Sequence, residues 1–309
     1  MILTVTLNPC IDKTVWIKKM ETGRIIRSQR VTYQSGGKGI NVSRVLTKLG
    51  VENNALTFGG GASGRHLTEL LRQEGIQHRI IPIDGMVRTV TTVVEEDTYF
   101  QTAYVEPGPH LSEREINRMM DAFGEEAEAA ELIVLSGSAP DQEHAWMIPE
   151  MIGRGKKMGK KVWLDTRDKA FSIGVEARPY FIKPNLEELE QYIGRKIAGK
   201  ERLPVLQKLH DQGIAYVILS LGEEGAVMIC PEGVYYQEAF PVRVVNAVGS
   251  GDSFTAGFLY GYIQGYPPSK CLNLGCRAGA VNASMWEAAF VSSLKIEAYP
   301  FGKGQDKDK

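Results

Sequence analysis

The chain has 309 residues, of which 43% are hydrophobic, and its 36 basic and 37 acidic side chains leave a formal net charge of −1 at pH 7. Such a balance gives no general attraction to nucleic acid or to an anionic membrane, so we expect neither as a partner. No segment is apolar for long enough to span a bilayer as a helix. The length suits one large α/β domain or two smaller ones. We expect a single domain over residues 1–300, followed by a frayed tail at 301–309.

The cysteines and the first residues predict the compartment. Cys10, Cys230, Cys271 and Cys276 form no Cys-x-x-Cys pair and lack the spacing of a metal site. Residues 1–7 lack the basic flank of a signal peptide and predict a first strand instead. We therefore expect a cytoplasmic protein whose cysteines remain reduced.

Short apolar runs alternate with amphipathic stretches along most of the chain. This rhythm predicts an α/β fold with a mostly parallel sheet and helices on both faces. Ligands of such sheets bind at the carboxyl ends of the strands. The predicted strands are 56–58, 132–135, 162–164, 180–182 and 217–219, and the predicted helices lie near 64–73, 112–128, 142–158, 185–193 and 202–212.

Two regions, 13–34 and 88–105, break this rhythm with strand-like runs and no helical pattern. The runs 90–94 and 98–105 flank an acidic turn, as the strands of a hairpin do. We expect a small second sheet here, which serves either as a lid that excludes water or as the surface of a homodimer.

Two early motifs contain residues suited to ligand binding. Asp12 follows the first strand, where a carboxylate either holds two sugar hydroxyls or caps a turn. Residues 35–46 form a glycine loop that leads into a helix. It is not a Walker A loop, because Gly39 follows Lys38 where Ser or Thr would be needed. Three glycines with a lysine still favour a hydroxyl-rich or anionic ligand.

Residues 59–64 offer a competing interpretation. They satisfy Gly-x-Gly-x-x-Gly between a strand and a helix, and Asp84 ends the next strand-like run. This context is typical of dinucleotide binding and by itself predicts an NAD-dependent oxidoreductase. That hypothesis gives no role to the loops at Gly36 and Gly249.

Two further strand ends are ambiguous. Asn185 and Glu188 have the spacing of a capping box at a helix start. The same side chains, one turn apart, can hold Mg²⁺ through water molecules, and both interpretations stay open. Residues 220–225 follow another strand, either as a hairpin turn or as the edge of a nucleotide pocket.

The most informative stretch is 245–258, which reads as a strand, a glycine turn and the start of a buried helix. Backbone N–H groups at a helix start bind anions, and glycines let an anion approach the main chain. The helix dipole helps Asp252, in the first turn, to stay ionised. A carboxylate beside an anion site suits phosphoryl transfer to an alcohol. The alternative is an ordinary turn followed by an aspartate that the dipole favours.

These motifs, in this order, resemble those of the PfkB carbohydrate kinase family, whose fold is ribokinase-like. Residues 36–42 (Gly-Gly-Lys-Gly-Ile-Asn-Val) are similar to its N-terminal signature, and 248–253 (Val-Gly-Ser-Gly-Asp-Ser) to its C-terminal one. Residues 136–138 and 183–188 are also family-like, and the likeness covers about residues 1–290. The resemblance implies a three-layer α/β/α fold with a small β-sheet lid. It demotes the dinucleotide hypothesis, because the family's glycine-containing turn at that place binds no NAD.

Within the family, residues 4–9 and the Gly-Lys-Gly-Ile-Asn-Val phrase look most like the hexose-phosphate branch. The resemblance implies MgATP-dependent phosphorylation of a sugar phosphate. Fructose 1-phosphate, converted to the 1,6-bisphosphate, is the first expectation, and tagatose 6-phosphate is the second.

The resemblance also implies roles for individual residues. Asp252 would accept the proton of the attacking hydroxyl, and the backbone of Gly249, Ser250 and Gly251 would bind the migrating phosphoryl group. The residues implied to hold the sugar phosphate are Asp12, Arg27, Gly36, Gly37, Lys38, Asn41, Arg88 and Ser138, with the two arginines, on lid strands, gripping its phosphate. The residues implied to serve the nucleotide and the metal are Lys183, Asn185, Glu188, Ser220, Gly222, Gly225 and Asn282, with Glu188 on Mg²⁺ through water.

Three stretches depart from the family pattern. Residues 87–90 read Val-Arg-Thr-Val where the branch usually has Thr-Arg-x-Asn. Residues 165–168 lack a glycine often found there, and 286–289 replace a glycine-containing stretch near the nucleotide. Each departure bears on which sugar phosphate is used. A non-catalytic sugar-phosphate sensor is a further alternative, but a sensor needs no base, and the Gly-Ser-Gly-Asp element is complete.

Overall fold

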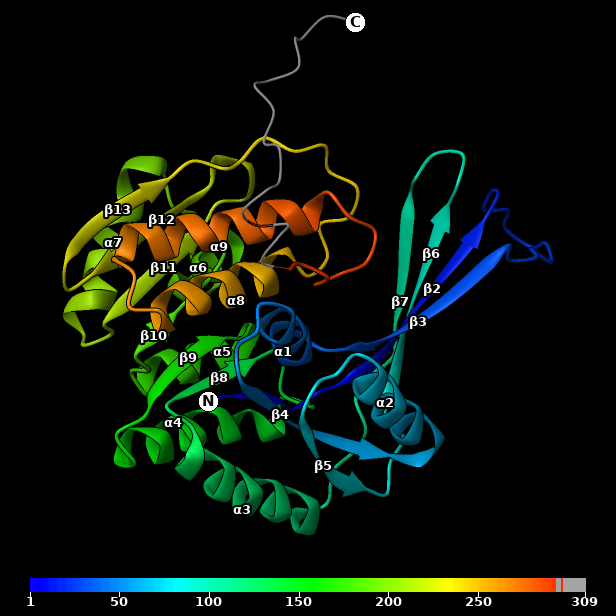
Figure 1. The fold of residues 1–309 in the computed structure, drawn as a ribbon, viewed down its shortest axis with the longest axis horizontal. Coiled ribbons are helices and arrows are strands. Elements are labelled where there is room, and N and C mark those ends of the chain that lie inside the picture. Colours follow the sequence, from blue (N-terminus) through cyan, green and yellow to red (C-terminus); the bar gives the residue numbers. More distant parts are fainter. Residues whose placement is uncertain (293–295, 297–309) are drawn as a thin grey trace, which may run out of the picture.

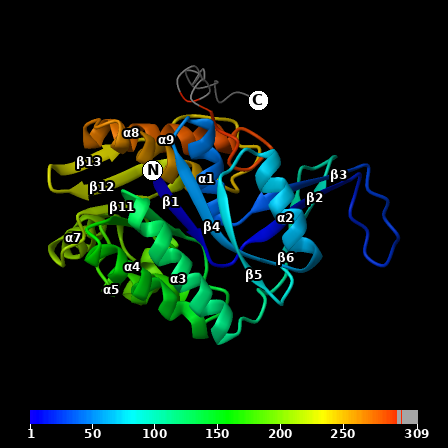
Figure 2. The same ribbon diagram turned by 60° about the horizontal axis from the view of Figure 1, so that its bottom comes forward.

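A large twisted sheet runs through the centre of the computed structural model, which describes residues 1–292 and 296 (Figures 1 and 2). Its strand order is β13-β12-β11-β10-β9-β8-β1-β4-β5. The strands from β11 to β5 are parallel, while β12 and β13 are antiparallel at one edge. The bounds are β1 Ile2–Thr6, β4 Asn53–Gly60, β5 His78–Ile83, β8 Leu132–Ser136, β9 Lys161–Asp165, β10 Phe181–Ile182, β11 Tyr216–Ser220, β12 Ala226–Cys230 and β13 Gly233–Gln237.

Helices cover both faces of this sheet, as Figure 2 shows. The central strands are apolar at successive positions because both of their faces are buried. In β8, Leu132 and Val134 pack toward α1, α8 and α9, whereas Ile133 and Leu135 pack toward α3 and α4. The helices are α1 Lys38–Lys48, α2 Gly61–Gln73, α8 Ser250–Ile263 and α9 Pro268–Ala283 on one face, and α3 Glu113–Ala129, α4 Met147–Lys157, α5 Asp168–Glu176, α6 Leu186–Ile193 and α7 Gly199–Asp211 on the other, with short 3₁₀ turns η1 Glu143–Trp146 and η2 Gly222–Glu224. The α/β architecture that the sequence predicts is confirmed.

A separate four-stranded sheet stands off the main one beside α1 and α2 (Figure 1). Its order is β3-β2-β6-β7, formed by β2 Cys10–Ile17, β3 Arg30–Gly36, β6 Arg88–Glu95 and β7 Gln101–Val105. We call it the lid sheet. Strands β2 and β6 are parallel, and β6 and β7 form the predicted hairpin.

The lid sheet differs from the sequence prediction at two places. Strand β7 begins at Gln101 instead of residue 98, because the backbone of Tyr99 takes the left-handed conformation (φ 58°) and its N–H bonds to the Glu95 carbonyl. This conformation and this hydrogen bond extend the turn through Phe100. Arg27 was expected on a lid strand, but it lies exposed in the connection between β2 and β3.

Within residues 1–292 and 296, no helix is long and apolar enough to cross a membrane. All four cysteines are buried free thiols. The predicted frayed tail, 301–309, lies outside the described residues.

Candidate active site

The N-terminus of α8 lies at the carboxyl edge of the sheet, and a tight turn leads into it. Gly249 caps the helix with φ 79°, a left-handed conformation that favours glycine. The N–H groups of Ser250 and Ser253 donate to backbone carbonyls, whereas within the described part of the chain the N–H groups of Gly251 and Asp252 have no acceptor. Such unused donors at a helix start form an anion site.

Asn282, on α9, braces this turn from behind and is fully buried. Its Nδ2 donates to the Val248 carbonyl (2.8 Å) and to Ser250 Oγ (3.0 Å), while its Oδ1 accepts from Ser253 Oγ and from the Ala289 N–H. A side chain engaged in this way has no capacity left for a nucleotide. The geometry therefore favours a supporting role for Asn282 in place of the nucleotide contact that the resemblance implies.

Asp252, in the first turn of α8, is only 4% exposed. Its Oδ2 accepts a hydrogen bond of 2.8 Å from Nδ2 of Asn41 on α1. Burial raises the pKa of Asp252 to about 6, and Lys38 acts in the opposite direction. A carboxylate with a pKa this near neutrality is suited to accept a proton.

Two lysines and a second aspartate surround Asp252. Asp165, at the end of β9, pairs with Lys38 Nζ (3.1 Å) and with Lys183 Nζ (3.1 Å), and it also accepts from the Thr255 hydroxyl. Burial raises the pKa of Asp165, but Lys183 and Lys38 outweigh this effect and hold that pKa below its usual value. Burial lowers the pKa of Lys38, and Asp165, with other carboxylates, holds it above its usual value.

Lys183 brings positive charge to the anion site itself. A Cβ atom built on Gly251 would lie 3.5 Å from Lys183 Nζ, so the ammonium group lies beside Gly251, whose N–H is one of the unused donors. A lysine and helix-terminal amides together stabilise the charge that a phosphoryl group carries during transfer.

The residues predicted to hold the sugar lie where β2 and β3 meet α1. The Asp12 carboxyl packs against Gly36, where any side chain would collide with it. Burial raises the pKa of Asp12, while its hydrogen bond with Cys10 lowers it. Asn8 donates to Ser138 Oγ (3.1 Å), which brings the segment after β8 to the same place. Gly37 provides the turn from β3 into α1.

Arg88, the first residue of β6, lines a cavity of about 450 Å³. Its Nη2 donates to the Asn8 carbonyl (3.2 Å), while its buried Nε has no hydrogen-bond partner among the described residues. Glu106 and His110 also line this cavity. An arginine nitrogen without a partner beside a cavity is a candidate donor to an anionic ligand.

The predicted capping box at α6 is present. Asn185 Oδ1 accepts from the Glu188 N–H (2.8 Å), and Glu188 Oε2 accepts from the Asn185 N–H (3.0 Å). The other oxygen of Glu188 lies 3.7 Å from Lys38 Nζ. Within residues 1–292 and 296, no group of three acidic, histidine or cysteine side chains could hold a metal ion directly. The donor set fits a hydrated Mg²⁺ near Glu188 better than a directly ligated ion.

The nucleotide-side segments predicted after β10 and β11 lie next to one another. Asn185 and Ser220 form an isolated parallel bridge, and Ser220 Oγ donates to the Pro184 carbonyl. Gly222 begins the short turn η2 that joins β11 to β12, Gly225 follows it, and both have positive φ angles. This segment is thus a hairpin turn located at the edge of the site.

The Gly-x-Gly-x-x-Gly turn between β4 and α2 is closed by packing. A Cβ atom at Gly60 would overlap the carbonyl oxygens of Ile83 and Gly85, and one at Gly61 would overlap Met86. The chain after β5 therefore occupies the place where a pyrophosphate would approach. This packing removes the structural basis of the NAD hypothesis.

The lid sheet touches the loop 284–290, which packs on the α8 turn. Gln34 of β3 donates to the Ala288 carbonyl (2.9 Å), and the rings of Tyr99 and Trp286 lie 5.7 Å apart. The next residue, Ala289, has φ 58° and lies against Gly249. We call these lid-to-loop contacts the bridge.

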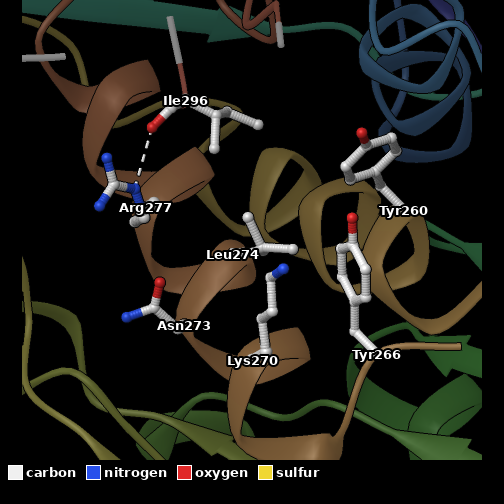
Figure 3. A pocket seen from close by; sticks show the side chains of 7 residues that line it. All are labelled: Tyr260, Tyr266, Lys270, Asn273, Leu274, Arg277 and Ile296. Carbon is white, nitrogen blue, oxygen red and sulfur yellow. Dashed lines mark hydrogen bonds between the residues drawn. The ribbon is translucent and has the colours of Figure 1, made fainter. Parts of the chain in front are cut away.

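A second cavity, of about 290 Å³, lies between the C-terminal part of α8 and α9 (Figure 3). Tyr260, Lys270 and Leu274 line it, and Arg277 donates to the Ile296 carbonyl at its edge. None of the site residues that the sequence predicts lines this cavity.

Asp165 is central to this geometry, and so is Arg44, which donates to Asn41 Oδ1 (2.7 Å). Sequence reasoning assigned neither residue a function. The signal for Asp165 was an acid directly after the buried run 162–164. The signal for Arg44 was a charge inside the apolar pattern of α1, which contains eight consecutive buried residues.

Comparisons with known proteins agree with this geometry. The chain matches the pfkB family carbohydrate kinases over residues 5–291. It is 32% identical over 284 residues to a 1-phosphofructokinase of Bacillus subtilis (strain 168), covering 92% of each chain. The phosphofructokinase-2 from Escherichia coli in complex with potassium is 25% identical, with a TM-score of 0.89 and coverage of 96% of this chain and 97% of that one.

A ribokinase from Thermotoga maritima, 17% identical, has the same fold, with a TM-score of 0.77 and coverage of 96% of this chain and 98% of that one. The fold is thus ribokinase-like. The chain belongs to the pfkB family of carbohydrate kinases. It is an ATP-dependent carbohydrate kinase, and the expectation drawn from its two signature motifs is confirmed.

Proposed function

We propose that the chain transfers the γ-phosphoryl group of MgATP to the 6-hydroxyl of fructose 1-phosphate, forming fructose 1,6-bisphosphate and ADP. The named substrate of the Bacillus relative supports this choice. Tagatose 6-phosphate is the second candidate, since the same branch of the family uses it. The observation that carries the proposal is the Asp252 carboxylate beside the amides and ammonium of one anion site.

In the proposed reaction, Asp252 accepts the proton of the sugar hydroxyl as its oxygen attacks the γ-phosphorus. The bond from the γ-phosphorus to the ADP oxygen breaks, and ADP leaves with the electron pair. The N–H groups of Gly251 and Asp252, with Lys183, stabilise the charge on the migrating group. Lys38 lies between the sugar side and the nucleotide side, because it contacts both Asp165 and Glu188.

The remaining assignments concern how the substrates are held. Asp12 binds sugar hydroxyls, and Arg88, whose Nε faces no protein acceptor, binds the phosphate that the sugar already carries. Arg27 belongs to the lid connection and joins this role only when that segment approaches the site. Glu188 would hold Mg²⁺ through water, and the ion would supply positive charge to the nucleotide phosphates.

We also propose that two copies associate through the lid sheet, which exposes several apolar side chains. The buried free thiols support the expected cytoplasmic location, where cysteines stay reduced.

The direct test is a coupled ADP-release assay with fructose 1-phosphate, tagatose 6-phosphate, fructose 6-phosphate and the unphosphorylated sugars. We expect the highest kcat/KM with fructose 1-phosphate. Asp252→Asn should lower kcat by a factor on the order of 10² to 10⁴, the usual size of a general-base effect, and leave ATP binding nearly unchanged.

Three outcomes would contradict parts of the proposal. A preference for an unphosphorylated sugar would remove the role of Arg88 on the substrate phosphate. Near-normal turnover of the Asp252→Asn variant would remove Asp252 as the base. Binding of a sugar phosphate without any release of ADP would favour the sensor alternative.

A further inference from the structure

Arg44 is a charged side chain that the proposed reaction does not use, although it is 0% exposed. It lies on α1 three residues after Asn41, on the same face of the helix. Its Nε pairs with Glu74 Oε2 at 2.8 Å, directly after the end of α2. A buried arginine destabilises the fold unless its charge is paired and its donors are used. The other donors of Arg44 should therefore also have acceptors.

Those donors point in two directions. Nη1 donates to Asn41 Oδ1 at 2.7 Å, and Nη2 donates to both the hydroxyl and the carbonyl oxygen of Ser35, near the end of lid strand β3. Glu74 completes the arrangement, because it accepts from the N–H (3.0 Å) and the hydroxyl (2.6 Å) of the same serine. Arg44 thus joins the lid strand to Asn41.

The chemistry of arginine determines which way the Asn41 amide faces. A guanidinium has donors and no acceptor, so Asn41 must turn its oxygen toward Arg44. The Asn41 Nδ2 group then faces Asp252, and its hydrogen bond of 2.8 Å favours the ionised carboxylate. In the reversed orientation, the amide oxygen would face that carboxylate and repel it.

We propose that Arg44 is a positioning residue for phosphoryl transfer, which keeps the Asn41 amide oriented toward Asp252 and connects that orientation to the lid strand. This inference rests on the proposed role of Asp252 as the base. It assigns Arg44 no contact with either substrate. Its partner Glu74 neutralises the charge of Arg44 and, through Ser35, holds the end of β3 against α1.

The test replaces the pair together, as Arg44→Met with Glu74→Gln, so that no unpaired charge is buried. We expect kcat to fall about tenfold, less than the roughly 10²- to 10⁴-fold effect of losing the base itself, because Asp252 stays in place. KM for ATP should change little. The acid limb of the kcat–pH profile should move upward by about one pH unit, as expected for a carboxylate that loses a charge-assisted hydrogen bond. Lys38, Lys183 and Asp165 also face Asp252, and these changes leave all three in place.

A purely structural role predicts a different result. Loss of folded protein lowers the apparent kcat equally at every pH and leaves the acid limb where it was, and this outcome would overturn the proposal. The control is Arg79→Met with Glu126→Gln, which removes a more exposed arginine–glutamate ion pair between β5 and α3 (3.1 Å) and should leave the limb unmoved.

A second variant serves if the double replacement does not fold. Arg44→Lys keeps the positive charge opposite Glu74 but lacks the planar fork that reaches several acceptors. The same upward shift is expected, and an unshifted limb contradicts the proposal here too. In an Asn41→Ala background, replacing Arg44 should cause no further shift, and an additive shift would show that Arg44 acts by another route.

The experiment separates this inference from the function on which it rests. If Asp252→Asn keeps its turnover, the base assignment fails, and the positioning role fails with it. If Asp252→Asn loses turnover while the Arg44 variants keep the wild-type acid limb, the base assignment stands and only the role of Arg44 is wrong.

Discussion

Asp252 is suited to accept a proton in the reaction because burial destabilises its charged form in the folded protein. Burial raises its pKa from 3.8 to about 6. Between these two values, the folded state binds more protons than the unfolded chain, so stability falls as the pH rises. Above pH 6, the full cost of the ionised group is present, on the order of 3 kcal/mol for a shift of this size.

Asp252→Asn should therefore stabilise the protein while it lowers turnover. The amide resembles the protonated acid, so it avoids the cost of the buried charge. We expect Tm to exceed that of the wild type at pH 7.5, and most of the difference to be lost at pH 4, close to the unfolded pKa. Thermal unfolding at the two pH values measures this, with Asp121→Asn on the exposed face of α3 as the control. An equal or lower Tm at pH 7.5 would show that the neighbouring lysines compensate fully for burial.

Single residues also show where sequence reasoning stopped. Asp252 was identified because its glycine turn and apolar helix are adjacent to it in the chain. Asp165 was not, because its role depends on Lys38 and Lys183, which only the folded sheet brings to it. Arg44 was hidden for the same reason, since its partners come from β3 and from the residue after α2.

At the scale of elements, the site depends on how α8 begins. Gly249 combines a left-handed backbone with close packing, because a Cβ atom there would lie 3.1 Å from the Ala289 nitrogen. Gly265, just after the same helix, has nearly the same φ (71°) but nothing within 4 Å of such an atom. Comparing substitutions at the two glycines therefore distinguishes the effect of backbone strain from the effect of a displaced anion site.

Gly249→Ala and Gly265→Ala should each cost about 1–2 kcal/mol of stability, the usual price of a left-handed residue with a side chain. Only Gly249→Ala should also lower kcat, by a factor on the order of 10², because it displaces amides that bind the migrating group. Denaturant unfolding and steady-state kinetics on both variants test this. Similar kcat losses in the two would mean that general destabilisation explains the effect.

Elements were easier to predict than their ends. The buried runs at β8, β9 and β11 have flanking turns and periodicity that identify them locally. The start of β7 was missed because the left-handed backbone of Tyr99 leaves no mark in the sequence. The two stretches described above as lacking a glycine of the family pattern also contain such a backbone, since Asp168 and Ala289 adopt positive φ angles.

At the scale of the whole molecule, the lid sheet is the surface best suited to bind another chain. On strand β7, Tyr104 is 56% exposed and Val105 is 60% exposed. Neighbouring side chains on a strand point to opposite faces, so these two residues report on the two faces of the lid separately. An apolar surface of this kind is typical of association sites.

We expect the chain to form a homodimer. One of the two substitutions, Tyr104→Asp or Val105→Asp, should convert it to monomers. The variant that does so identifies the buried face, because a charge in an apolar interface is costly. Sedimentation equilibrium measures the change, with Tyr236→Asp on the edge strand β13 (69% exposed) as the control. A monomeric wild type, or dimers that survive both lid substitutions, would rule out association through this sheet.

The bridge from Gln34 and Tyr99 to the loop at Trp286 has a thermodynamic consequence. A ligand that shifts the lid sheet also shifts the loop that supports the α8 turn. A ligand that shifts the turn affects the lid sheet to the same extent. Occupancy on the acceptor side and on the donor side must then be energetically linked, each raising or lowering the affinity for the other by one common factor. If that factor is favourable, ATP binds more tightly once the sugar phosphate is bound.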